Sequence, residues 1–129
     1  MKLSAKEIEI MSTKNGKERY IYFIKRVVDN EAVWVLDDNS FALSGDDSGH
    51  DMLMLWPARE YASVCATEDW GNYKAKELTL DYVIEKPLPD LSMKGVKLGV
   101  FMVPSIFDTP VINADNLLLD LENEYHKYD

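Results

Sequence analysis

The sequence predicts an α+β protein in which an antiparallel sheet is separated along the chain from most of the helices. Two helical segments come first, several β-prone runs then follow through short polar turns, and an amphipathic helix ends the chain. Strands joined directly by turns pair antiparallel, whereas a doubly wound parallel sheet needs a helix after each strand. We expect one domain over residues 1–129, with a mainly antiparallel sheet of about five to six strands, two N-terminal helices and one C-terminal helix packed on it.

The N-terminal segment carries two helix signals. Ser4 and Glu7 have the Ser-x-x-Glu spacing of a capping box, which predicts a short helix over 5–11. Ser12 or Thr13 is then placed to cap a second helix that runs to about Val28. Its apolar face has helical spacing and consists of Tyr20, Phe23, Ile24, Val27 and Val28. The basic residues fall largely off that face, so we expect them in solvent; they are Lys17, Arg19, Lys25 and Arg26.

Three strands are predicted in the next part of the chain. Residues 32–36 and 41–43 are β-prone and flank a polar turn, which is the pattern of a hairpin. Residues 52–56 form a continuous apolar run, typical of a strand buried on both faces. Because short loops join all three, we expect an antiparallel meander. Pro57 then suits the first turn of a helix over 58–66, with Tyr61, Ala62 and Cys65 toward the sheet.

The second half contains shorter elements between clear breakers. Residues 74–78 read as an edge strand with protective lysines, and Thr79 can cap a helix that Pro87 and Pro89 stop. Strands are predicted over 96–103 and 110–112. Asn113 can cap the closing helix. The apolar stripe of that helix comprises Leu117, Leu118, Leu121, Tyr125 and Tyr128.

The net charge of −9 is unevenly distributed. Residues 29–51 contain seven acidic side chains and neither lysine nor arginine. A negative surface repels phosphate backbones, so nucleic acid is not expected as a partner, whereas a basic protein is. A single cysteine fits a reducing compartment, no apolar run is long enough to span a membrane, and the start of the chain becomes charged before a signal sequence can form. We therefore expect a cytoplasmic location.

The candidate chemical groups favour structural roles. The acidic run at 46–51 lacks the spacing of a calcium loop or a zinc site, and its composition is that of a turn. Cys65 could pair with His50 or His126, but it lies late in a helix among small apolar residues, where a cysteine packs as a hydrophobe. No phosphate loop, nucleophile elbow or metalloprotease motif is present. We expect no catalytic residue, cofactor or metal, and lean against an enzyme.

Several segments together resemble a known family. The most specific are Leu53-Met54-Leu55-Trp56-Pro57, Glu60-Tyr61-Ala62 and Cys65-Ala66, with Leu88-Pro89-Asp90-Leu91 and Val100-Phe101 further along. They resemble the bacterial domain of unknown function 2750 family, and the resemblance covers nearly the whole chain. It implies a small α+β fold and carries no established activity. The segment 105–110 departs from the glycine-containing turn expected there. A looser similarity to SseB N-terminal-type domains points toward protein interaction.

Two functional hypotheses follow. The first is a non-enzymatic protein-interaction module, of which a toxin-neutralising immunity protein is one form, acting as a monomer or homodimer with an acidic docking face. Its predicted contact residues are Asp37, Asp38, Asp46, Asp47, Asp51 and Trp70. The alternative is a small-ligand-binding or enzymatic domain with a pocket near Trp70, Tyr61 and His50.

Overall fold

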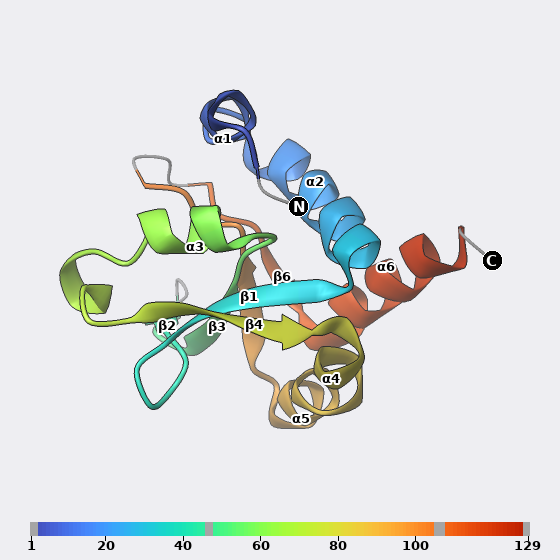
Figure 1. The fold of residues 1–129 in the computed structure, drawn as a ribbon. Coiled ribbons are helices and arrows are strands. Elements are labelled where there is room, and N and C mark those ends of the chain that lie inside the picture. The colour runs from blue at the N-terminus through green and yellow to red at the C-terminus, as the bar shows by residue number, and fades with distance from the viewer. Residues whose placement is uncertain (1–2, 46–47, 105–107, 128–129) are drawn as a thin grey trace.

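The computed structural model describes residues 3–45, 48–104 and 108–127 of the 129-residue chain. Its helices are α1 (Ala5–Met11), α2 (Gly16–Asn30), α3 (Arg59–Val64), the short 3-10 helix η1 (Glu68–Trp70), α4 (Leu80–Glu85), α5 (Pro87–Lys94) and α6 (Ala114–His126). Its strands are β1 (Ala32–Asp37), β2 (Leu43–Gly45), β3 (Asp51–Leu55), β4 (Lys74–Thr79), β5 (Lys97–Val100) and β6 (Val111–Asn113). The predicted α+β class is confirmed (Figure 1).

The strands form two sheets rather than one. β1 pairs with β4, and the other four strands are arranged in the order β2-β3-β5-β6. All described pairings are antiparallel except that of β3 with β5, so the sheets are mainly antiparallel, as predicted. The two sheets meet at one antiparallel bridge, where Trp34 and Trp56 exchange backbone hydrogen bonds of 2.9 Å in both directions. This bridge makes the two sheets one continuous layer.

The predicted meander is only half correct. β2 and β3 form the expected antiparallel hairpin, but β1 and β2 share no ladder. Only Asp37 and Phe41 bridge the ends of the intervening turn, in which Asn39 has a φ of 66°. β1 pairs instead with β4, which provides a partner for each of its six residues, whereas β2 has only three residues.

Side-chain caps determine where the first two helices begin. The Ser4 hydroxyl accepts a hydrogen bond from the Glu7 backbone, and α1 has its predicted bounds. The predicted cap of α2 was wrong. The hydroxyls of Ser12 and Thr13 donate to carbonyls of the last turn of α1, and Asn15 caps α2 by accepting from the Glu18 backbone. An amide side chain one turn later therefore starts α2.

A helix that the sequence reading missed follows α4. Pro87 ends α4 as predicted, but it also occupies the first turn of α5, where no intrahelical donor is required. Gly95 ends α5 with a φ of 68°, a left-handed conformation that glycine adopts without steric cost. In the view of Figure 1, α4 and α5 lie together below β4, and α2 and α3 lie above β1.

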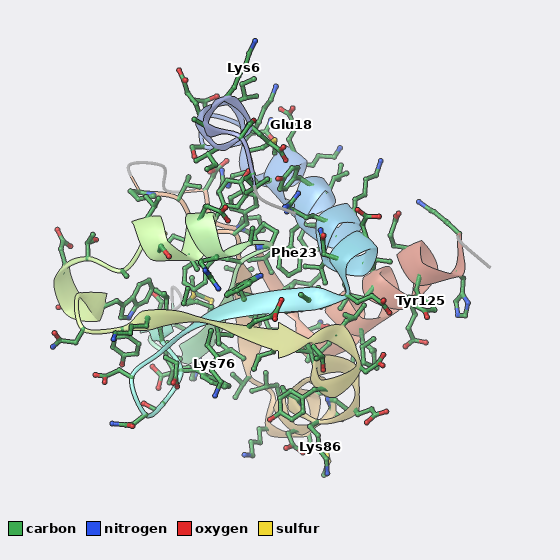
Figure 2. All side chains as sticks on the ribbon, in the orientation of Figure 1. Lys6, Glu18, Phe23, Lys76, Lys86 and Tyr125 are labelled. Carbon is green, nitrogen blue, oxygen red and sulfur yellow. The ribbon has the colours of Figure 1, made fainter. Side chains whose placement is uncertain are left out.

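The core lies between the sheet layer and the helices on both sides. Phe23, Val27, Trp56, Leu98 and Leu117 are fully buried in it. Figure 2 shows Phe23 pointing to the interior, while Lys6, Glu18, Lys76 and Lys86 extend outward.

The closing helix begins at Asn113, whose side chain accepts from the Asn116 backbone as predicted. Leu117 and Leu121 of its stripe are buried. Tyr125, by contrast, is 45% exposed, which corrects its place in the stripe, and Glu124 takes the buried position. Tyr128 lies outside the described residues.

Candidate functional site

The predicted acidic contact residues that the structure describes lie at the end of β1, in the turn after it, and at the start of β3. Asp37 is half-buried at the end of β1, Asp38 is exposed in the turn that follows, and Asp51 is exposed at the start of β3. Asp46 and Asp47 lie outside the described residues. His50 is exposed beside Asp51. Asp51 is the register partner of Gly45 across the β2–β3 hairpin, which places it at one end of that hairpin.

Strand β4 brings basic side chains to this acidic segment. Lys74 lies opposite Asp37 in the β1–β4 register, and the Lys76 ammonium lies 5.9 Å from the centre of the Phe41 ring. The separation of charge along the chain is therefore not preserved in space. β4 partly balances the charge at Asp37 and leaves Asp38 and Asp51 as the exposed acids among the described members of the set.

Trp70 lies in a wall of an open cleft of about 700 Å³. Three chain segments line the cleft: β2 from Leu43 to Gly45, the connection from Cys65 through η1, and residues 102–104 after β5. Met102 and Val103 provide apolar surface, while Glu68 and Asp69 are exposed at the edge. Among the described residues, the lining contains two carboxylates and no lysine, arginine or histidine.

Trp70 is held in place by its contact with Trp56. The two rings meet edge to face with centroids 6.1 Å apart, and Trp56 is completely buried. Trp70 itself remains half-buried, so part of its ring is available to a partner. Glu68 at the start of η1 has a φ of 54°, an unfavourable conformation for a residue with a side chain. The turn therefore presents Glu68, Asp69 and Trp70 in one defined arrangement.

The opposite side of the cleft is anchored through one carbonyl. The indole N–H of Trp56 donates to the Met102 oxygen at 2.9 Å, and the Cys65 thiol donates to the same oxygen at 3.3 Å. Both donors belong to buried residues, and Cys65 also lines the cleft. Because this segment follows β5 immediately, the two contacts fix how the chain leaves the sheet.

A buried arginine, Arg19, also holds the segment that follows β5. Its burial corrects the expectation that Arg19 faces solvent. Arg19 is completely buried, and its Nε donates to the Phe101 carbonyl at 3.0 Å. Its Nη1 donates to the Lys14 carbonyl at 2.8 Å and to the Asp108 carboxylate at 3.0 Å. Phe101 has a φ of 55°, which is rare for an aromatic residue, and its ring lies 5.9 Å from the guanidinium.

Asp108 completes this anchor from the surface. Its carboxylate accepts a hydrogen bond of 2.6 Å from the backbone N–H of Gly16, at the start of α2. This bond and then the Arg19 guanidinium hold the pKa of the Asp108 carboxyl below its usual range. Asp108 thus ties the chain before β6 to the beginning of α2.

Cys65 has the properties predicted for a structural cysteine. It is buried, its thiol is a hydrogen-bond donor, and burial raises its pKa to about 11. A group that ionises so weakly is protonated at neutral pH and is a poor nucleophile. Cys65 therefore contributes to the floor of the cleft as a thiol.

The three residues of the alternative pocket are not all found at the cleft. Trp70 lines it, whereas Tyr61 and His50 do not. Tyr61 is 2% exposed, and its hydroxyl lies 3.0 Å from that of Tyr22, which donates to the Glu7 carboxylate at 2.5 Å. Burial raises the pKa of both tyrosines, so this network joins α1 to the core with protonated hydroxyls.

The described residues do not provide two other kinds of site. They contain no group of three or more His, Cys, Asp or Glu side chains placed to hold a metal ion. None of the helices in residues 3–45, 48–104 and 108–127 is both long and apolar enough to cross a membrane.

These features define a small α+β domain with a carboxylate-edged cleft beside a partly exposed tryptophan. The chain belongs to the family described as "Protein of unknown function (DUF2750)", whose sequence pattern matches residues 20–121. The match confirms the family predicted from the Leu-Trp-Pro and Glu-Tyr-Ala segments, and includes most of the cleft-forming elements. The similarity to SseB-type domains stays a prediction. No curated protein matches the chain.

Proposed function

We propose that this protein is a non-enzymatic, cytoplasmic protein-interaction module that binds a basic partner at the Trp70 cleft. The observation that carries the proposal is the composition of the cleft. Its described lining residues combine an aromatic wall, apolar surface and two exposed carboxylates, with no basic side chain among them. Tryptophan is among the residues that contribute most to protein interfaces, especially where neighbouring contacts exclude water from it.

The cleft favours a particular kind of partner side chain. Lysine and arginine place their methylene stems on apolar surface while the charged end stays near polar groups. Trp70 and Met102 offer such surface, and Glu68 and Asp69 stand at the edge to pair with the charge. Asp51 lies opposite the cleft-lining Gly45 and extends the negative surface beyond the cleft. A basic toxin domain bound by an immunity protein is one partner of this kind.

The test selects short peptides from a random displayed library on the immobilised protein and measures their affinity by fluorescence anisotropy. We expect the enriched peptides to combine Lys or Arg with apolar residues. The variant Trp70→Leu should weaken binding at least about tenfold, because it removes the aromatic anchor. The double variant E68Q/D69N should weaken binding by a similar factor, because it removes the two partners of the peptide's positive charge. Added salt should weaken binding to the wild type more than to E68Q/D69N.

A matched control separates the cleft from overall charge. The double variant E9Q/E122Q removes two exposed carboxylates that do not line the cleft. It should bind the selected peptides as the wild type does. Peptides that lack a basic excess, or that bind both cleft variants unchanged, would show that this surface is not the docking site.

A further inference from the structure

A second cavity, of about 410 Å³, is lined by residues of α2, β1, α3 and β4. Both helices pack against β1 (Figure 1). Arg26 and Asn30 line the cavity from α2, Arg59 from the start of α3, and Trp34 from β1. Its residues are distinct from those of the Trp70 cleft. A volume of this size suits a small molecule.

The Arg26 guanidinium has unused hydrogen-bonding capacity. Its Nε is buried and has no hydrogen-bond partner in the structure. Its Nη1 lies 3.7 Å from the Glu7 carboxylate, which is an ion-pair distance but too long for a direct hydrogen bond. Buried donors are almost always paired, so Arg26 retains donor capacity that the described residues do not satisfy.

Arg59 faces the same cavity with even fewer contacts. Its guanidinium lies 5.1 Å from the centre of the Trp34 ring. Beyond this contact, it forms no hydrogen bond or ion pair with the residues that the structure describes. A guanidinium near an aromatic ring keeps its N–H groups available for planar acceptors. Two arginines from different helices therefore present donors to one space.

Two carboxylates also line the cavity, and they narrow the chemical class of ligand that fits it. Glu60 follows Arg59 in α3, and Glu77 lies opposite Trp34 in the β1–β4 register. Neither forms an ion pair with an arginine of the described chain. The cavity is therefore balanced in charge, with both signs available to a ligand that carries both.

We propose that this cavity binds a small molecule through a carboxylate or phosphate group held by Arg26 and Arg59. Both anions accept paired hydrogen bonds from guanidinium groups. An amino group on the same molecule would strengthen binding, because Glu60 and Glu77 line the cavity and offer acceptors.

The test records proton–nitrogen correlation spectra, including the arginine Nε–H signals, during titrations at constant ionic strength. The probes are inorganic phosphate, acetate, glycine and O-phosphoethanolamine, with sodium chloride as the reference. We expect the Arg26 and Arg59 Nε–H signals to shift and saturate. Phosphate against acetate distinguishes the two anions, and each amino-bearing probe should bind more tightly than its simple counterpart.

Variants decide whether the cavity is responsible. Arg59→Gln should weaken binding at least about tenfold, because it removes a charged donor from an exposed position that the fold does not require. Arg26→Gln should do the same. Lys25→Gln, an exposed cation on α2 outside the cavity, should leave binding unchanged. Linear shifts equal to those with chloride, or equal affinity in Arg59→Gln, would overturn the proposal.

Discussion

Replacement of the buried Arg19 by methionine tests how the chain leaves β5. Methionine is unbranched and replaces the aliphatic stem of arginine, so the substitution removes the guanidinium and keeps much of the packing of the stem. Four acceptors then lose a donor: the backbone carbonyls of Phe101, Lys14 and Asp108, and the Asp108 carboxylate. The Phe101 carbonyl matters most because its bond to Arg19 is buried.

The expected loss of stability follows from these contacts. A buried acceptor left without a partner costs about 1–3 kcal/mol, and a hydrogen bond from a charged donor contributes about 1.5–3 kcal/mol. Removal of the charge also relieves its desolvation, which offsets part of the loss. The Lys14 and Asp108 oxygens lie nearer to solvent and can be hydrated. We therefore expect Arg19→Met to lower the free energy of unfolding by about 2–4 kcal/mol.

Urea unfolding followed by far-ultraviolet circular dichroism measures this change. Lys17→Met, an exposed cation on the same helix, serves as the matched control and should change the free energy of unfolding by less than about 0.5 kcal/mol. Asp108→Asn should destabilise less than Arg19→Met, because its carboxylate is half-exposed and the amide oxygen can still accept from Gly16. A loss below about 1 kcal/mol in Arg19→Met would refute the anchoring role.

Two further predictions concern the sheet and the cysteine. In Gly99→Ala, the new Cβ would lie 2.6 Å from the Met54 sulfur, so we expect a loss of about 1–3 kcal/mol in thermal unfolding. If Met54→Val is already present, Gly99→Ala should lower the stability by less than it does in the wild type, because the clashing sulfur is gone. Stability losses of the two substitutions that simply add would contradict the clash. For Cys65, burial raises the pKa from 9.0 to about 11, so the folded state favours the thiol. This stabilisation is complete below about pH 9 and is lost as the pH rises toward 11. In Cys65→Ala, the free energy of unfolding, measured with urea, should fall less steeply between pH 9 and 10 than in the wild type. An equally steep fall in both proteins would contradict the role of the thiol.

Local signals in the sequence correctly located the starts of three helices. Ser4, Thr79 and Asn113 each accept the backbone hydrogen bond expected of a helix cap. These predictions succeeded because a cap depends on groups three residues apart. The helix α5 was missed although Pro87 and Gly95 mark its two ends, since proline was read only as a terminator.

The buried role of Arg19 could be seen in the sequence only in part. Arg19, Phe23 and Val27 are four residues apart, so a helix places all three on one face. Its charge argued for solvent, however, because an unpaired buried cation is very unfavourable. The groups that satisfy it, Phe101 and Asp108, lie 82 and 89 residues further along the chain. No local pattern identifies such partners.

The sequence by itself determined the α+β class, the family and the apolar residues of the core. These properties depend on short-range periodicity and on motifs such as Leu-Trp-Pro, which are complete within a few residues. Only the tertiary structure decided that β1 pairs with β4, and that β3 and β5 run parallel. It alone brought Trp70 beside the segment after β5, and Arg26 beside Arg59. The physical reason is that strand pairing and cavities depend on contacts between segments far apart in the chain. The local sequence does not determine which of the possible distant segments will pair or pack together.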